Sequence, residues 1–382
     1  MCCKTRSNSV LHYGPIIALS LIAFITTSTV WCIFSMLKPL EYAGGMMVLA
    51  QFLTIVVGIV ACFFLAVYKG GGAIPLEWHP ENEEDEKRLQ FCKLCNGFKP
   101  PRSHHDHVSG RCIAKMDHFC PWINSAVGNR NHVDFLGFVS LVPLGCIYAT
   151  SIQAIWLWNF MPELRHWQQV AHFHPAHFNS MLYVIFGLAC AVAVGLAVGA
   201  LGVFQWMGVW CNTTQIEEWI IEKANDRPRD KPFVFPYNLG GAANIGEVFT
   251  RWYSGDGTEW TVREGSHPYA LTEEQLAQKA RKRAKTATYK ITVSNSRWLR
   301  GVEFGFRVWW SSQWPLEPRI YVKPGDYVRA WAYEGDWLYG EVVVPEADGF
   351  EAVKPRQRGW FPDKCIADDE EGMTESDAAP ET

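Results

Sequence analysis

Four long stretches that are nearly free of charged residues constrain the fold of this chain more than any other feature. About 20 consecutive apolar residues are enough to cross the hydrocarbon core of a bilayer as a helix. The alternative, four buried helices of a soluble protein, is disfavoured because soluble helices rarely stay uncharged for so long. The sequence therefore predicts an all-α bundle of four transmembrane helices, at Pro15–Leu37, Gly44–Tyr68, Val133–Trp158 and Phe178–Trp210.

Lys and Arg residues are distributed unevenly among the segments that connect these spans. The N-terminal tail carries Lys4 and Arg6, and the central loop carries a larger group that runs from Lys87 to Arg130. The short loops after the first and third spans hold only Lys38 and Arg165. Because basic residues are retained on the cytosolic side, we expect a multi-pass protein with the central loop and both termini in the cytosol.

Changes in composition divide the rest of the chain. An amphipathic helix is expected at Gln215–Ala224, and an aromatic, turn-rich segment at Phe233–Phe249. The basic run Lys279–Lys290 is short and isolated, so we interpret it as a connector with a solvated helix face and expect no nucleic-acid partner. We predict seven parts: a tail (1–14), two spans (15–68), a Cys/His loop (69–132), two spans (133–210), a cytosolic segment (211–287), a small β-barrel (288–366) and an acidic disordered tail (367–382).

The barrel is predicted from short alternating strands. Apolar and polar residues alternate at 289–293, 327–331 and 337–344, and the turn residues Pro324-Gly325-Asp326 separate the first two of these runs. The acidic tail that follows has too few apolar residues to bury a core.

Cysteines in the central loop have the spacing of metal ligands. Cys92 and Cys95 form a CxxC turn, and His105 and Cys112 follow in the same loop. Zn²⁺ prefers four such ligands in a tetrahedron, and metal binding would supply folding free energy that this polar loop lacks. In a cytosolic loop a disulfide framework is not expected. Cys2 and Cys3, beside the first span, fit either lipid modification or ordinary exposed thiols.

A second group of residues carries the pattern of a nucleophilic site. Asp117 and His118 are followed, one residue later, by Cys120. A free cysteine is mostly protonated at neutral pH, so it needs a neighbouring base to react quickly. His118 could take this proton, and Asp117 could orient the imidazole. From the residues alone, a structural role for this group is as well supported as a catalytic one.

Residues 92–135 resemble the cysteine-rich domain of the DHHC protein S-acyltransferases. The matching pieces are Cys92-x-x-Cys95, Pro101-Arg102-Ser103-His104-His105, Lys115-Met116-Asp117-His118, Cys120-Pro121-Trp122-Ile123-Asn124, Val127-Gly128 and Asn131. Further along, Asn212-x-Thr214-Gln215-Ile216-Glu217 is similar to the family's TTxE motif with one Thr replaced, and Pro236–Phe249 is similar to its membrane-packing motif. Arg358-Gly359-Trp360-Phe361-Pro362 resembles members of the family that end in an SH3-like domain.

The resemblance implies a protein S-palmitoyltransferase. Cys120 would take the acyl group from palmitoyl-CoA and pass it to cysteines of substrate proteins at the cytosolic membrane surface. The four helices would hold the acyl chain among membrane lipids, and burial of each CH₂ group contributes roughly 0.8 kcal/mol. The expected location is the endoplasmic reticulum, with the Golgi as the alternative.

The chain departs from the family at a second zinc site. The four ligands of that site would fall at Asp106, Ser109, Phe119 and Ala126, and none of these is Cys or His. We therefore expect one zinc, with an apolar patch around Phe119. The SH3-like domain departs too, because Lys364 and Cys365 replace residues usual in a ligand-binding SH3, so we expect it to dock a protein partner or another part of the chain.

Two other functions are compatible with parts of this pattern. A catalytically weak or inactive DHHC-like scaffold, which docks partners through its SH3-like domain, would explain the missing zinc ligands. A transporter or channel is less well supported, since no charge lies deep within a predicted span.

Overall fold

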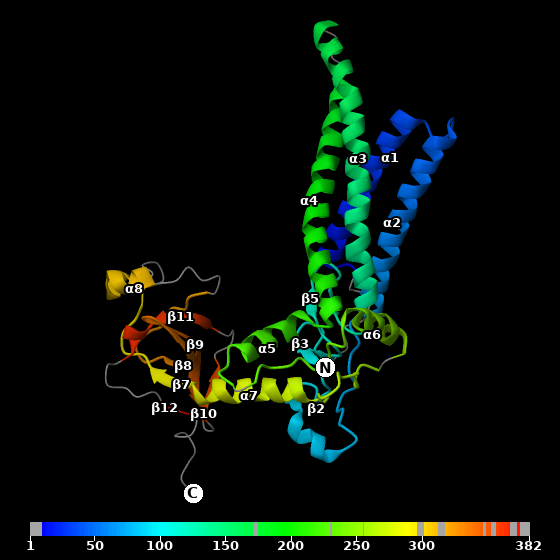
Figure 1. The fold of residues 1–382 in the computed structure, drawn as a ribbon. Helices are drawn as coiled ribbons and strands as arrows, with labels where there is room; N and C mark the ends of the chain where they lie inside the picture. Colours follow the sequence, from blue (N-terminus) through cyan, green and yellow to red (C-terminus); the bar gives the residue numbers. More distant parts are fainter. Residues whose placement is uncertain are drawn as a thin grey trace. The chain divides into compact units, whose positions relative to one another are not determined.

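A computed structural model describes the fold (Figure 1). The described residues are 10–170, 175–229, 231–254, 256–295, 302–311, 318–346, 349–352, 357–366 and 373–374. They form two compact units, residues 1–274 and residues 275–382. Cys2, Cys3 and nearly all of the predicted acidic tail lie outside the described residues.

Four long apolar helices dominate the first unit. They are α1 (Tyr13–Leu37), α2 (Ala43–Lys69), α3 (His132–Val170) and α4 (Pro175–Cys211). Each is long and apolar enough to cross a membrane, and large apolar side chains cover their outer surfaces. The four predicted spans are confirmed, and the protein is an integral membrane protein. The helix α3 continues past Trp158, where the prediction ended, because the loss of hydropathy there ends the span without ending the helix.

Small residues let α3 and α4 approach each other closely. A Cβ atom added at Gly202 would lie 3.0 Å from the carbonyl oxygen of Val139, and one at Gly195 would lie 2.9 Å from the Cβ of Cys146. Lipid tails are as apolar as leucine, so close packing of this kind replaces the hydrophobic effect in holding membrane helices together. At the start of α1, Gly14 lies directly against the backbone of Pro121, which ties this helix to the loop that carries Cys120.

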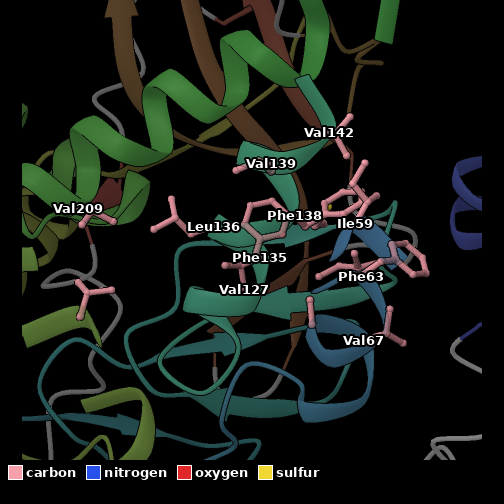
Figure 2. Close-up of a cluster of buried hydrophobic side chains, with 14 of the residues drawn as sticks. Ile59, Phe63, Val67, Val127, Phe135, Leu136, Phe138, Val139, Val142 and Val209 are labelled. Carbon is pink, nitrogen blue, oxygen red and sulfur yellow. The ribbon is translucent and has the colours of Figure 1, made fainter. Parts of the chain in front are cut away.

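The largest apolar core joins the helices to the Cys/His loop. Figure 2 shows Ile59 and Phe63 of α2 beside Phe135 and Phe138 of α3, with Val127 of the loop among them. Cys120 belongs to the same cluster and is 4% exposed. The loop that bears the thiol therefore packs into the apolar core of the helix bundle and is not a separate domain attached to it.

The Cys/His loop itself consists of three short antiparallel hairpins. They pair β1 (Gln90–Cys92) with β2 (Gly97–Lys99), β3 (His104–Asp106) with β4 (Arg111–Ile113), and β5 (His118–Cys120) with β6 (Ser125–Val127). A short 3₁₀ helix, η2 (Glu83–Arg88), precedes them. Two-stranded hairpins are marginal in isolation, so this loop needs support from a metal and from the rest of the chain.

Three helices follow the bundle. They are α5 (Gln215–Asn225), α6 (Gly241–Ser254) and α7 (Ala270–Ala284). The helix expected at Gln215–Ala224 is present, and Thr214 begins it with a capping box to Glu217. The turn-rich structure predicted for Phe233–Phe249 is wrong for the second half of this segment, which belongs to α6. The solvated helix face expected in the basic run is present in its first part, which is the exposed end of α7, whereas its last residues form the strand β7 (Ala287–Lys290).

An antiparallel sheet forms the second unit. Its strands are β7 (Ala287–Lys290), β8 (Tyr327–Glu334), β9 (Trp337–Glu346), β10 (Gly349–Ala352), β11 (Arg358–Pro362) and β12 (Met373–Thr374). The order is β10-β9-β8-β7-β12, and β11 also pairs with β9. The short helices η3 (Val302–Phe304), α8 (Phe306–Ser311) and η4 (Asp363–Cys365) accompany it. Val322, Val328 and Phe361 lie in its core, so the predicted strand-rich region exists with its own apolar interior.

Candidate active site

Strand geometry brings the histidine and the cysteine together. His118 and Cys120 are two residues apart on β5, and side chains two apart on a strand point to the same face. The thiol lies close enough to the imidazole to help raise the pKa of His118. Phe119 points to the opposite face of the hairpin, where it is paired with Ala126 of β6. The sequence alone left this convergence open, and the short strand decides it.

Asp117 is held by three different elements. Its Oδ2 lies 2.8 Å from Nδ1 of His118 and accepts a hydrogen bond of 2.9 Å from Nε2 of Gln205 on α4. Its Oδ1 accepts a bond of 2.7 Å from the backbone N–H of Gln215, at the start of α5. Burial opposes the charge, but the hydrogen bond from His118, the charge of nearby histidines and the bond from Gln205 outweigh it, and the pKa of Asp117 falls to about 2.

The environment of His118 favours its charged form. Burial alone would lower its pKa, yet the hydrogen bonds to Asp117 and Cys120 raise the pKa of His118 to about 9. With Nδ1 bound to Asp117, the other ring nitrogen remains for the thiol. The ring also meets Phe135 edge-on at 5.5 Å between centroids. The three residues therefore have the geometry of an acid–imidazole–thiol relay.

An apolar cavity opens beside the thiol. Its volume is about 390 Å³, and residues from all four membrane helices line it together with Cys120 and Trp122. Along α3 the lining runs from Phe135 to Cys146, which is about 16 Å of helix. Among the described residues that line it, none is charged. The cavity therefore suits a long hydrocarbon chain whose head lies at Cys120.

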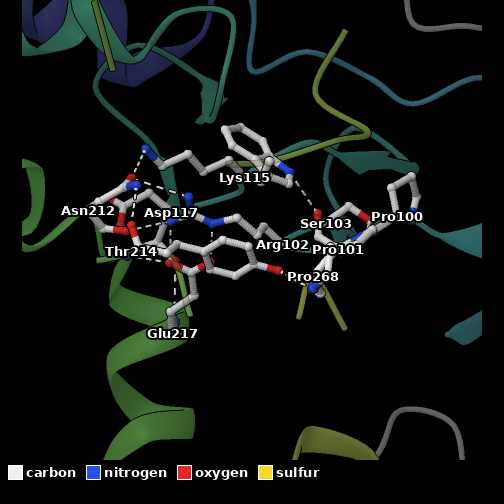
Figure 3. A network of polar contacts seen from close by, with 12 residues as sticks. Pro100, Pro101, Arg102, Ser103, Lys115, Asp117, Asn212, Thr214, Glu217 and Pro268 are labelled. Atoms are coloured by element: carbon white, nitrogen blue, oxygen red, sulfur yellow. Dashed lines mark hydrogen bonds and ion pairs between the residues drawn. The ribbon is translucent and has the colours of Figure 1, made fainter. Parts of the chain in front are cut away.

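A buried ion pair ties the Cys/His loop to α5 (Figure 3). Nε and Nη2 of Arg102 bond to the two carboxylate oxygens of Glu217 at 2.6 and 2.7 Å. Both side chains are almost fully buried, and the guanidinium also faces the ring of Tyr237 at 4.5 Å. A bidentate pair of this kind has a defined geometry as well as strength. It fixes the start of α5, and with it the N–H of Gln215 that binds Asp117.

Asn212 connects this pair to a buried lysine. Its Oδ1 accepts bonds from Nη1 of Arg102 at 3.2 Å and from Nζ of Lys115 at 2.8 Å, and its Nδ2 donates to the carbonyl of Tyr237. Burial and the charge of Arg102 lower the pKa of Lys115 to about 7. Asn212, Arg102, Lys115 and Glu217 were noticed only as parts of motifs, and the structure shows that they form one network.

Gln205 was missed by sequence reasoning. It is 4% exposed, and its amide bridges Asp117 and His132. A signal was available, because a polar residue inside an otherwise apolar span is costly unless it has a partner.

The four predicted zinc ligands come together. Cys92, Cys95, His105 and Cys112 offer ligand atoms that all lie within 4.8 Å of one another. Nδ1 of His105 lies 3.5, 3.4 and 3.8 Å from the sulfurs of Cys92, Cys95 and Cys112. A tetrahedral zinc with its usual bond lengths would separate N and S by roughly 3.6 Å. The donor set and its spacing therefore fit Zn²⁺ without rearrangement.

The positions of the second family zinc site contain other contacts. The carboxylate of Asp106 accepts bonds from the backbone N–H groups of Val108 and Ser109. Ala126 packs with Ile113, Met116 and, in part, Ile216. Across the described residues, no second group of candidate metal ligands was found.

Comparison with known proteins agrees with this geometry. The family described as DHHC palmitoyltransferase matches residues 85–222. Palmitoyltransferase ZDHHC6 of Homo sapiens is 38% identical over 93% of this chain and 90% of its own length. The proteins of the same name from Bos taurus and Danio rerio are 37% and 36% identical, over 97% and 94% of this chain and 94% and 91% of their own.

These relatives match the chain from the membrane helices to the second unit, and the family domain coincides with the site built above. The chain belongs to the family of DHHC palmitoyltransferases.

Proposed function

We propose that Cys120 is the nucleophile of this protein S-palmitoyltransferase, with His118 and Asp117 as its activating pair. The observation that carries the proposal is the contact of one thiol with both the relay and the apolar cavity. The sulfur attacks the thioester carbon of palmitoyl-CoA, the C–S bond to CoA breaks, and the CoA thiolate takes a proton. A substrate cysteine then attacks the acyl-enzyme and releases Cys120.

His118 holds and moves the proton in both steps. Its raised pKa means that an imidazolium can persist beside a Cys120 thiolate, and this cation can protonate the departing CoA sulfur. Asp117 stays ionised and keeps the ring in one orientation. The cavity binds the acyl chain, so each buried CH₂ contributes roughly 0.8 kcal/mol before ordering costs.

Zinc supports this site without taking part in the reaction. We propose one zinc per chain, held by Cys92, Cys95, His105 and Cys112, which would fix the hairpins β1–β4 and supply folding free energy. The apolar contacts of Ala126 and the backbone bonds of Asp106 support a single site, because neither position offers a cysteine or histidine.

The second unit is proposed to be an SH3-like barrel that docks a protein partner or another part of this chain. Its antiparallel sheet and separate core support this assignment. We also propose the seven-part division of the chain, cytosolic termini, and substrates whose cysteines lie near the cytosolic membrane surface. The uneven distribution of basic residues supports this orientation. The endoplasmic reticulum remains the expected compartment, with the Golgi as the alternative, and microscopy of the tagged chain with compartment markers tests it.

Acyl-enzyme formation tests the central proposal. Purified protein in detergent is mixed with labelled palmitoyl-CoA, beside Cys120→Ser and a matched variant, Cys211→Ser, which removes an exposed thiol at the end of α4. We expect hydroxylamine-sensitive label on the wild type and on Cys211→Ser, and none on Cys120→Ser. Equal label on all three proteins, or none on any, would instead support a non-catalytic scaffold.

A further inference from the structure

A short helix of the second unit exposes three large aromatic side chains. In α8, the exposed fractions are 69% for Phe306, 38% for Trp309 and 74% for Trp310. Their spacing of three and four residues puts them on one helix face. Their ring centroids lie 5.4 to 6.3 Å apart, so they form one patch, which we call the aromatic face of α8.

The rest of α8 is fastened to the sheet. Val308 is 1% exposed, and its carbonyl accepts a hydrogen bond of 3.0 Å from Nε1 of Trp337. Phe304, just before the helix, packs against the core of the unit. Because these contacts fix which side of α8 faces inward, the aromatic face is held outward. Contiguous exposed apolar patches usually mark an interaction site.

The size of this patch argues against a protein partner. A fully buried aromatic side chain contributes about 150–250 Å², so three partly exposed rings offer about 500 Å² at most. A stable protein interface needs about 800 Å² from each partner. The same area requirement argues against a second copy of this chain as the partner.

Insertion into a bilayer surface does not require a contact area of this size. Aromatic side chains, Trp above all, concentrate at the headgroup level of membranes. The four spans tether the second unit to a bilayer, which gives the patch a high effective concentration there. Arg307, whose side chain is 91% exposed and forms an ion pair of 3.6 Å with Asp336, flanks the patch and marks its polar edge.

We propose that the aromatic face of α8 inserts into the headgroup region of the bilayer that this chain itself spans. The proposal rests on the membrane placement of α1–α4 and not on the chemistry of Cys120. It makes α8 an anchor that restricts the second unit to the membrane surface.

A fluorescent amino acid encoded at position 307 tests the insertion. The full chain is reconstituted in vesicles of phosphatidylcholine with a minor share of phosphatidylserine, and nitroxide is attached to the lipid headgroups. We expect the lipid nitroxide to quench this probe, and we expect the less polar environment of the headgroup region to shift its emission to the blue. The double variant Phe306→Ser/Trp310→Ser should lose most of the quenching while it still forms the acyl-enzyme at the wild-type level.

Two further probe positions separate the competing outcomes. Tyr333 on β8 is 65% exposed, and a probe there should remain unquenched. Equal quenching at Tyr333, quenching that survives the double variant, or emission that changes only with the number of protein copies per vesicle would each overturn the proposal. Leu196 on α4 is 72% exposed, so a probe there reports the membrane placement itself by its response to acyl-chain nitroxide. Silence at Leu196 would overturn that placement and the anchor together, whereas a response at Leu196 without quenching at 307 would overturn the anchor alone.

Discussion

The two halves of the Cys/His loop reach a defined structure by different means. In the first half, β1–β4, three cysteines and a histidine converge on one point with the spacing of a zinc site. In the second half, the hairpin β5–β6, the described residues bring no such ligands together, and Phe119 and Ala126 occupy positions that hold metal ligands in the family resemblance.

Close backbone packing supports the second half. The carbonyl of Gly72 accepts a hydrogen bond from Ala114, and that of Gly71 accepts one from Arg130. A Cβ atom at Gly71 would lie 2.8 Å from the carbonyl oxygen of Ala126. The comparison teaches that a polar loop with few apolar residues depends on a metal for a stable structure. A hairpin that packs against the apolar core of the helices can instead be held by close contacts that exclude water.

Loss of zinc should produce the largest effect. We expect Cys95→Ser to lose its metal and to unfold β1–β4, since structural zinc contributes roughly 10 kcal/mol or more. Elemental analysis and limited proteolysis measure both consequences. Asp106→Asn, a change at a second-site position, is the matched control and should keep one zinc per chain. A wild-type value near two would contradict the single-site proposal.

A change in the relay of Asp117, His118 and Cys120 should produce the second largest effect. Asp117→Asn keeps the shape but removes the charge, and we expect acyl-enzyme formation to slow on the order of 10³-fold. Stopped-flow or quench measurements with labelled palmitoyl-CoA give the rate. Gln205→Leu, which removes only one bond to Asp117, should slow the reaction much less. Equal rates for Asp117→Asn and wild type would exclude the relay.

The pH dependence follows from the raised pKa of His118. The imidazolium is stable below about 9, so the wild-type rate should fall as the pH rises through that value. Asp117→Asn should move this fall to lower pH, because the carboxylate that raises the pKa is gone. The interaction also stabilises the fold fully below the ordinary histidine pKa of about 6.5, and this contribution is lost as the pH rises through about 9.

The connection between the two halves is the next test. Arg102 belongs to the zinc-binding half, and its pair with Glu217 fixes the helix start that binds Asp117. Arg102→Met leaves the buried carboxylate of Glu217 without its cationic partner, which should cost about 3 kcal/mol of stability. Thermal unfolding measures the loss. Arg88→Met, at an exposed ion pair with Glu273, should change little.

The smallest effect is expected at the close approach of Gly71. Gly71→Ala places a methyl group against Ile113 and Ala126, and relief of this overlap should cost about 1–3 kcal/mol. Gly246→Ala is the control, because a Cβ there meets no atom within 4 Å. If both variants unfold at the wild-type temperature, the close packing of Gly71 against Ala126 does not support the hairpin.

Much of the architecture could be predicted because it depends on local composition. Hydropathy identified the four spans within a few residues at the ends next to the Cys/His loop and α5, and ligand spacing identified the cluster of Cys92, Cys95, His105 and Cys112. The helix α6 was harder to predict, since its residues read as turn-rich until Asn244 is seen to bond the end of α4.

The sequence by itself determined the four membrane helices and the set of candidate metal ligands, because each depends on residue type and spacing along the chain. Only the tertiary structure decided that His118 and Cys120 share one strand face, that Gln205 and Gln215 hold Asp117, and that the thiol borders an apolar cavity. These facts join residues up to about 100 positions apart, and no local pattern specifies which side chains a folded chain will bring together.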